Sequence, residues 1–188
     1  MLTARQVYAM LENRSLWDTA TRIHQLLASA GVPHAVAGGV AVCLHGYQRN
    51  TVDLDLLVRK EDFDRIRTVF EKNDCIWDAD CAEFRTSSEI AIHLLMAGDR
   101  AGPDSEVTLP DPHGTRCLVE VEGLPVLTLA RLIESKIACG QGNLRRTHKD
   151  YADVVELIAR HRLNSSFGRF IHKSLRPAFR ELVHASRG

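Results

Sequence analysis

The sequence predicts an α/β or α+β protein in which helices flank a mixed β-sheet and a helical extension follows toward the C-terminus. Helical periodicity dominates both ends of the 188 residues, short strand-like apolar runs fill the middle, and the chain has no internal repeat or low-complexity tract. A β-rich centre between helices is typical of a mixed sheet covered by helices. We expect N-terminal helices over 1–30 that pack on the core, an α/β core over 31–125 and a helical part over 126–188.

In the first half of the chain, segments whose apolar residues recur at helical spacing follow and precede short strand-like segments. Ser15 is the expected N-cap of a helix whose apolar residues recur every three or four positions, and Gly31 ends it. Pro33 suits the start of a strand, and acidic residues in the first turn favour a helix that begins near Glu61. The expected elements are a helix over 16–30, a strand over 32–37, a short helix over 38–46, a strand over 51–58 and a helix over 61–73.

The second half begins with strand-like runs and ends in helices. Residues 98–114 include three prolines and are expected to form a loop. Thr128 and Thr147 are the expected N-caps of two helices, and Pro177 is expected to interrupt the helical residues that follow. The expected strands are 75–79, 82–87, 89–98 and 115–123, and the expected helices are 128–139, 147–161 and 164–187.

Composition argues against membrane and secretory classes. No apolar stretch approaches the roughly 20 residues that a membrane-spanning helix needs, and the first residues lack the apolar segment of a secretory signal. Five cysteines without metal-ligand spacing indicate reduced thiols. We therefore expect a cytoplasmic protein that does not bind membranes.

Charge is balanced overall but unevenly distributed along the chain. Residues 145–188 hold ten Lys/Arg and four Asp/Glu, although the net formal charge of the whole chain is zero. A basic C-terminal part attracts phosphate-rich ligands, or it is a solvated helical surface that offsets the acidic remainder of the chain.

Two aspartates interrupt a segment that otherwise has the composition of a buried strand. Asp53 and Asp55 are two residues apart in "TVDLDLLV", so they share one face of the strand. Two carboxylates on one face repel each other, and a divalent cation such as Mg²⁺, with phosphate oxygens completing its shell, relieves that repulsion. An exposed strand face with two solvated acids is the alternative interpretation of this motif.

A glycine pair precedes these aspartates at a strand-to-helix turn. Gly38 and Gly39 allow a ligand to approach the backbone, and the start of the next helix offers free N–H groups to a phosphate. A tight turn without a ligand accounts for the glycines equally simply. Arg49 and Thr51 add two further candidate phosphate contacts just before the aspartates.

Together these motifs resemble the nucleotidyltransferase superfamily typified by DNA polymerase β, most closely its minimal and abortive-infection types. The resemblance rests on Gly38-Gly39, thirteen intervening residues, then Asp53-Leu54-Asp55, with Arg49-x-Thr51 before them. It implies that the glycines bind the nucleotide and that both aspartates are metal ligands for Mg²⁺ or Mn²⁺. It covers roughly residues 30–160.

Two charged residues lie on the apolar faces of the C-terminal helices. Lys136 falls in the middle of an apolar stripe, where a lysine either extends to solvent or meets an anion. Asp150 shares a face with Val154 and Leu157, and Asp153 lies at the edge of that face. A Lys136–Asp150 pair would explain both residues, whereas the helix dipole alone would explain Asp150. Because the stripe is apolar, Lys136→Met is expected to preserve the fold.

The resemblance extends to these helices. In abortive-infection-type nucleotidyltransferases a helical lysine is followed by a K-D-x-x-D element, which here is Lys149-Asp150-Tyr151-Ala152-Asp153. It implies nucleotide or catalytic contacts for Lys136 and Asp150, in addition to the catalytic role of Asp53 and Asp55.

One position departs from the pattern of the superfamily. A third carboxylate is usual on a later strand, and the matching run "IAIHLLMAG" has His93 there instead. An unperturbed histidine is mostly neutral near neutral pH, so the site is expected to carry about one negative charge less and to bind Mg²⁺ more weakly than nitrogen-accepting metals. Glu89, Glu120 and Glu122 are the candidates for a replacement carboxylate.

Two functions follow from these residues. The first is a metal-dependent enzyme that transfers a nucleoside monophosphate from an NTP to a hydroxyl of a tRNA, a protein or a small molecule, with a toxin–antitoxin pair as one setting. The alternative is a catalytically impaired nucleotide-binding or antitoxin-like partner protein of the same fold. His93 favours the alternative, and the retained charges at Asp53, Asp55, Lys136 and Asp150 favour the enzyme, because orphan buried charges are costly.

Overall fold

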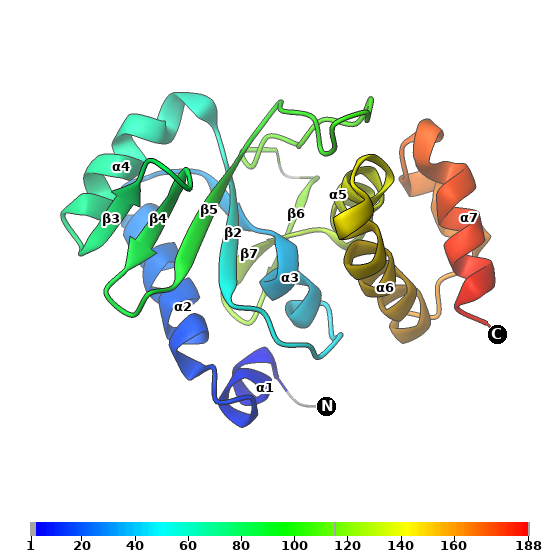
Figure 1. Cartoon of the computed structure of the whole chain (residues 1–188), viewed down its shortest axis with the longest axis horizontal. Coiled ribbons are helices and arrows are strands. Elements are labelled where there is room, and N and C mark those ends of the chain that lie inside the picture. Colours follow the sequence, from blue (N-terminus) through cyan, green and yellow to red (C-terminus); the bar gives the residue numbers. More distant parts are fainter. Residues whose placement is uncertain (1–2, 115, 188) are drawn as a thin grey trace.

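The computed structural model describes residues 3–114 and 116–187 and contains a seven-stranded mixed sheet flanked by helices, as the sequence predicts (Figure 1). Its strand order is β3-β4-β5-β2-β1-β7-β6. The strands are β1 (His34–Val36), β2 (Asp53–Val58), β3 (Cys75–Asp78), β4 (Glu83–Thr86), β5 (Ala91–Met96), β6 (Leu118–Val121) and β7 (Leu124–Leu127).

The centre of the sheet is formed by β2, whose side chains alternate between two environments. Leu54 and Leu56 face the core and are buried, whereas Asp53 and Asp55 on the opposite face are half-buried. β2 runs parallel to β5 in a register that pairs Asp55 with His93, and antiparallel to β1. This register places the aspartates and the histidine on one face of adjacent strands.

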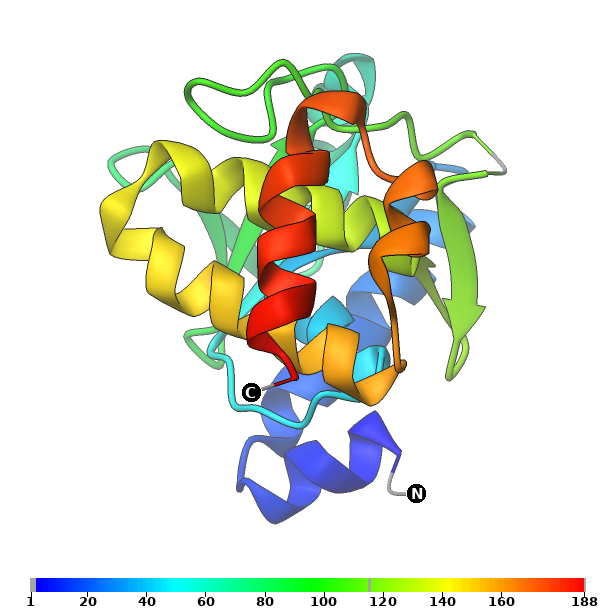
Figure 2. The same ribbon diagram turned by 90° about the vertical axis from the view of Figure 1, so that its right-hand side faces the viewer.

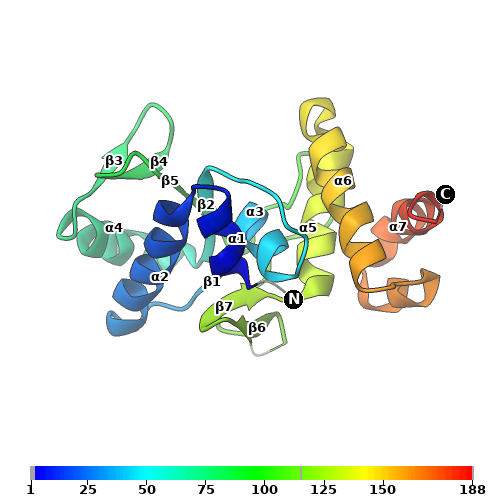
Figure 3. The ribbon, with the colours of Figure 1, turned by 90° about the horizontal axis from the view of Figure 1, so that it is seen from below.

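Helices cover both faces of this sheet. They are α1 (Ala4–Met10), α2 (Arg14–Ser29), α3 (Gly38–Leu44), α4 (Phe63–Glu71), α5 (Leu129–Gly142), α6 (Leu144–Arg160) and α7 (Arg176–Ala185). Figure 3 shows α2 and α4 on one side and α3, α5, α6 and α7 on the other. In Figure 2, α7 lies in front of the α5–α6 pair as the outermost helix. The face with the aspartates is the one toward α3, so the site lies between the sheet and α5–α6.

The loop over 98–114 is present as expected and packs against α5. A Cβ at Gly102 would lie 2.1 Å from the Ala138 carbonyl oxygen, so only glycine lets the loop approach the helix this closely. An isolated bridge between Arg100 and Thr108 closes the loop on itself. The loop therefore forms a wall beside the C-terminal end of β5.

Three local expectations about helix ends are corrected. α2 begins after Asn13, so Ser15 is not its N-cap. α6 begins after Asn143, whose side chain accepts a hydrogen bond from the Arg145 amide, and the Thr147 hydroxyl instead donates to the Gly140 carbonyl at 2.6 Å. Thr128 is the N-cap residue of α5, as expected, although its side chain makes no cap hydrogen bond. Pro177 stands in the first turn of α7, so it begins a helix after two 3-10 turns.

Two elements lack individual bounds in the sequence-based expectations. Helix α1, one of the N-terminal helices expected over 1–30, is capped by Thr3, which accepts from Gln6 while the Gln6 side chain accepts from the Thr3 amide. Strand β7 contains Pro125, which disfavours strand assignment, but it pairs with β6 and β1 near one edge of the sheet. Among the described residues, none of the helices combines the length and the hydropathy that crossing a bilayer requires.

Candidate functional site

The first feature of the site is the close approach of the α3 backbone to Asp55. The Ala37 amide donates to the Asp55 carbonyl at 2.9 Å, and a Cβ on Gly38 would lie 1.7 Å from Asp55 Oδ2. Gly38 also has a φ of 56°, which L-residues with a side chain rarely adopt. The first glycine of the pair is thus required both by its backbone conformation and by the carboxylate beside it.

The second glycine is required by a different neighbour. A Cβ on Gly39 would lie 2.5 Å from Thr51 Oγ1 and 2.9 Å from an Arg49 guanidinium nitrogen. Thr51 in turn donates its hydroxyl to Asp53 Oδ1 at 2.5 Å. The residues predicted to bind a nucleotide, Gly38, Gly39, Arg49 and Thr51, therefore lie together, and in this structure they pack against and orient the acidic residues.

Asp53, Asp55 and His93 converge on one point of the sheet. One potential ligand atom from each lies within 4.8 Å of the others, which would allow the three to share a metal ion. His93 Nδ1 is 3.1 Å from Asp55 Oδ1 and 3.8 Å from Asp53 Oδ2. The expected position of His93 beside both aspartates is present, and two carboxylates with one imidazole are a donor set that divalent cations accept.

Glu83 is a member of this cluster that sequence reasoning missed. Its Oε2 is 2.9 Å from His93 Nε2, its side chain is 8% exposed, and its other oxygen forms an ion pair with Arg85. Strand alternation would have placed Glu83 and Arg85 on one face of β4. Because β4 and β5 form an antiparallel hairpin whose register places Glu83 opposite His93, ten residues away, pairing of the two expected strands over 82–87 and 89–98 is the signal that could have found this contact.

The three carboxylates raise the pKa of His93 to about 9, chiefly through the hydrogen bond with Asp55 and despite the opposing effect of burial. This corrects the expectation of a neutral imidazole, because in the absence of a metal the ring carries a proton and a positive charge near neutral pH. Burial acts to raise the pKa of Asp53, but the Thr51 hydrogen bond and the charges of Lys149 and His93 outweigh it and lower that pKa.

A second charged cluster holds α5 and α6 together behind the cleft. Lys136 Nζ lies 2.9 Å from Asp150 Oδ1 and 2.7 Å from Asp153 Oδ2, and all three side chains are buried. Arg49 Nε lies 2.8 Å from Asp153 Oδ1. The structure thus contains the anticipated Lys136–Asp150 pair, and it adds Asp153 and Arg49 as partners in a network with two charges of each sign.

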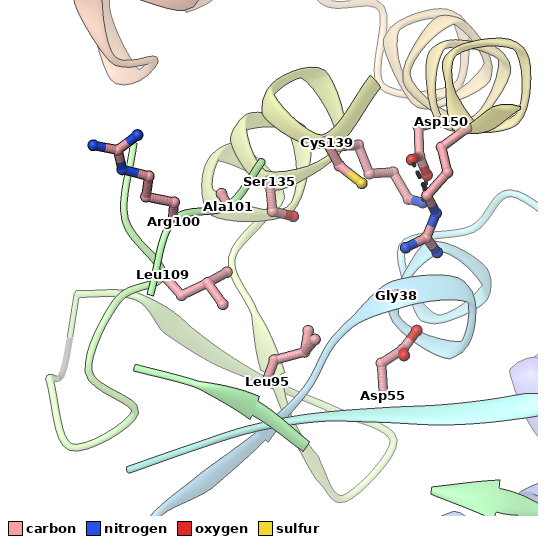
Figure 4. Close-up of a pocket in the computed structure, with 11 residues that line it drawn as sticks. Gly38, Asp55, Leu95, Arg100, Ala101, Leu109, Ser135, Cys139 and Asp150 are labelled. Carbon is pink, nitrogen blue, oxygen red and sulfur yellow. Dashed lines mark hydrogen bonds and ion pairs between the residues drawn. The ribbon is translucent and has the colours of Figure 1, made fainter. Parts of the chain in front are cut away.

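Between the two clusters lies an open cleft of about 150 Å³. Figure 4 shows Asp55 and Gly38 at one side, Leu95 and Leu109 at the floor, and Arg100 directed away from the cavity. Asp150 Oδ2 is buried and has no hydrogen-bond partner among the described residues, and Arg146 Nε is 3.8 Å from it. The residues that line the cleft are Gly38, Asp55, Leu95, Arg100, Ala101, Leu109, Ser135, Lys136, Cys139, Arg146 and Asp150.

The three glutamates considered as replacements for His93 lie elsewhere. Glu89 is 83% exposed in the turn before β5, with Arg85 at 3.9 Å. Glu122 accepts hydrogen bonds from the Ala4 and Arg5 amides at the start of α1, and Glu120 is exposed on β6 at the far edge of the sheet. His93, supported by Glu83, therefore occupies the third position of the site.

Solved structures with the same fold are nucleotidyltransferases. The chain aligns with ANT(2'')-Ia in complex with adenylyl-2''-tobramycin at a TM-score of 0.56 and 17% identity, covering 87% of this chain and 98% of that one. A nucleotidyltransferase-like antigenic protein from Paracoccidioides brasiliensis aligns at 0.55 and 18% identity, covering 89% and 87%. A protein of Thermotoga maritima assigned to the nucleotidyltransferases aligns at 0.52 and 18% identity, covering 74% and 93%.

No protein-family model and no curated protein matches the sequence. The structural likeness shows that the chain has the nucleotidyltransferase fold, in agreement with the resemblance found in its motifs. The finer resemblance to the abortive-infection type stays a prediction.

Gly38→Ala is expected to lower the free energy of unfolding more than Gly31→Ala does. Both glycines have a positive φ, but a Cβ at Gly31 meets nothing within 4 Å, whereas one at Gly38 collides with Asp55. Gly31→Ala should cost about 1–2 kcal/mol for the left-handed conformation alone. Urea unfolding of both variants measures the difference, and equal losses would show that Asp55 moves aside without cost.

Lys136→Met is expected to destabilise the fold, which corrects the expectation drawn from the apolar stripe. The change leaves Asp150 and Asp153 buried with less compensation, and breaking a buried ion pair costs about 3–5 kcal/mol. Lys60→Met is the matched control, since its pair with Asp99 is exposed and should contribute at most about 1 kcal/mol. Chemical unfolding measures both losses. If Lys136→Met were as stable as wild type, the ion pairs of Lys136 would contribute no more to stability than an apolar side chain does.

The stability contributed by His93 is expected to depend on pH in the metal-free protein. Its pKa is about 9 in the folded state against 6.5 for an ordinary histidine, so the folded state binds the proton more tightly. The contribution is complete below pH 6.5 and is lost as the pH rises through 9. We expect the difference in free energy of unfolding between wild type and His93→Gln, measured in EDTA, to shrink as the pH rises between those limits. A difference that is independent of pH would contradict the charged imidazole.

Proposed function

We propose that the protein transfers a nucleoside monophosphate from an NTP to an acceptor hydroxyl with the help of a divalent metal. The observation that carries this proposal is the convergence of Asp53, Asp55 and His93 beside a cleft that also presents Arg146. Metal-coordinating oxygens next to a cation are what a polyphosphate substrate requires. The nucleotidyltransferase fold of the chain supports the same activity.

Asp53, Asp55 and His93 are the residues that would hold Mg²⁺ or Mn²⁺. The bound cation would supply charge neutralisation for the phosphates and a lowered pKa for an oxygen bound to it. In the proposed role of the protein itself, the Gly38 backbone keeps Asp55 in place and Thr51 orients Asp53 through the 2.5 Å hydrogen bond. Arg49 acts indirectly in this proposal, by fixing Asp153 and with it the α5–α6 network.

Phosphate binding is assigned in this proposal to Arg146, whose Nε comes no closer than 3.8 Å to Asp150 Oδ2, and to Lys149. Lys136 is shared between two buried aspartates, so its charge is already compensated. Arg146 lines the cleft. Lys149 is exposed one turn later on α6, and its charge helps to lower the pKa of Asp53. Long basic side chains of this kind bind phosphate oxygens through charge-assisted hydrogen bonds.

Asp150 is proposed to contact the acceptor. Its Oδ1 is bonded to Lys136, whereas the buried Oδ2 is an acceptor without a hydrogen-bond partner among the described residues, in the wall of the cleft. A buried carboxylate oxygen without a hydrogen-bond partner favours a ligand that donates to it. A hydroxyl on the acceptor molecule would satisfy this oxygen and be oriented for reaction at the same time.

Two observations bear on the class of the acceptor. ANT(2'')-Ia, one of the structural neighbours, has been solved with an adenylylated tobramycin, which favours a small hydroxylated molecule. The basic residues over 145–188 favour a phosphate-rich acceptor such as tRNA. A protein acceptor or a toxin–antitoxin partner in a cytoplasmic setting stays within the same proposal.

A second candidate function rests on His93. In the metal-free protein its positive ring is bonded to Asp55 and Glu83, so it compensates the carboxylates that a metal would otherwise neutralise. A nucleotide-binding or antitoxin-like partner with impaired chemistry would have this character. Metal-dependent transfer of a labelled nucleotide separates the two functions.

Transfer is expected from at least one labelled NTP when the protein is incubated with Mg²⁺ or Mn²⁺ and with total RNA, lysate protein or polyhydroxylated small molecules as separate acceptor pools. Asp53→Asn/Asp55→Asn should abolish metal-dependent NTP binding and transfer, because it removes both carboxylate ligands of the proposed metal site. Label on one acceptor pool identifies its class. Binding that is unchanged in the double variant would refute the metal site, and binding without transfer to any pool would favour the impaired partner.

A further inference from the structure

We propose that Glu83 is a positioning residue that fixes His93 so that Nδ1 acts as a metal ligand, and that the site consequently prefers divalent transition metals to Mg²⁺. This inference deepens the proposed function and rests on its metal site. His93 is then a working part of the site, and the chain has replaced a carboxylate ligand by an oriented imidazole.

The geometry of the ring assigns a different task to each nitrogen. Nε2 is 2.9 Å from Glu83 Oε2, and a carboxylate oxygen accepts hydrogen bonds, so Nε2 is the nitrogen that donates its proton to Glu83. Nδ1 is then directed at Asp55 Oδ1, 3.1 Å away, and at Asp53 Oδ2, 3.8 Å away. A cation between these three atoms would meet one imidazole nitrogen and two carboxylate oxygens.

Glu83 is held firmly enough to impose this orientation. Its side chain is 8% exposed, and its second oxygen is ion-paired with Arg85 on the same strand. The neighbouring Phe84 is fully buried among Phe63, Phe70 and Trp77, so β4 cannot easily rotate. Histidine ligands of metals commonly donate their other N–H to a carboxylate, which fixes the ring and makes it a stronger ligand.

The same donor set decides which metals bind well. Mg²⁺ demands oxygen ligands and a near-octahedral shell, whereas transition metals toward the later part of the first row accept imidazole readily. Having His93 in place of one of three carboxylates therefore weakens the binding of Mg²⁺ more than the binding of Co²⁺ or Zn²⁺. The change is a matter of ligand chemistry and does not depend on which nucleotide is used.

A neighbouring group competes for Glu83 and has to be separated from this site in any test. Asp78, Cys81 and Glu83 also have ligand atoms within 4.8 Å of one another. Glu83 Oε2 is already bonded to His93, and Asp78 accepts hydrogen bonds from the Asp80 and Cys81 amides. Cys81→Ser removes the thiol from that group and leaves the His93 site intact.

The test is calorimetric titration of the full-length, nucleotide-free protein with Co²⁺ and, separately, with Mg²⁺ at one fixed pH. Glu83→Gln should weaken Co²⁺ binding about tenfold or more and reduce the preference for Co²⁺ over Mg²⁺. Glu89→Gln is the matched control, since Glu89 also lies near Arg85 but is exposed and faces solvent. It should bind both metals like wild type, as should Cys81→Ser.

The His93→Asp background distinguishes positioning from a general structural effect. There Glu83 faces a carboxylate instead of an imidazole, so adding Glu83→Gln should cost no Co²⁺ affinity. His93→Asp alone should reduce the preference for Co²⁺ over Mg²⁺, and His93→Gln should do the same, which keeps the proposal testable if Glu83→Gln does not fold. With Co²⁺ bound, wild type should also show a hyperfine-shifted, solvent-exchangeable imidazole proton that His93→Gln lacks.

One kind of result would overturn the role of Glu83 alone, and another would overturn the metal site itself. If Glu83→Gln binds Co²⁺ like wild type, or loses the same affinity in the His93→Asp background, Glu83 does not position a ligand although the metal site stands. If wild type binds neither metal, or if binding survives Asp53→Asn/Asp55→Asn, the proposed metal site is wrong and the role of Glu83 fails with it.

Discussion

Five carboxylates gather around one cleft, and the need to compensate their charge governs the arrangement of everything near them. Asp150 and Asp153 are balanced by Lys136 and Arg49 in a buried network that joins α6, α5 and the segment before β2. Asp53, Asp55 and Glu83 surround His93 on the sheet. Burying unpaired charge is costly, so Asp53 and Asp55 need a positive charge beside them, which the protonated His93 ring supplies in this structure.

The two clusters differ in how replaceable their cations are. The α5–α6 network holds its charges on fixed side chains and joins the two helices. This part of the structure therefore forms a rigid wall of the cleft. The sheet cluster depends on the His93 proton, which the proposed metal ion would replace. The close approach of Gly38 to Asp55 and the register of β2 with β5 fix the positions of these donors. The proposed site is thus organised in advance of its ligands.

Local sequence patterns predicted the parts of the site that depend on neighbouring residues. Asp53 and Asp55 share a face because a strand alternates, and Lys136 is conspicuous because its helical face is apolar. Gly38 was expected to make room for a nucleotide, whereas in the structure it makes room for Asp55. Contacts between side chains of different elements were harder to predict. The contact of Glu83 with His93 depends on the register of the β4–β5 hairpin, and the contact of Arg49 with Asp153 spans 104 residues of sequence. The charge of His93 follows from these contacts and was therefore misjudged.

The most direct measurement is a crystal structure with Mn²⁺ and a non-hydrolysable NTP analogue, using anomalous scattering to locate the metal. The account predicts a Mn²⁺ peak within bonding distance of Asp53, Asp55 and His93 Nδ1, with Glu83 still accepting from Nε2 and the phosphates directed toward Arg146. A nucleotide bound without metal at this position, with His93 still bonded to Asp55, would contradict it.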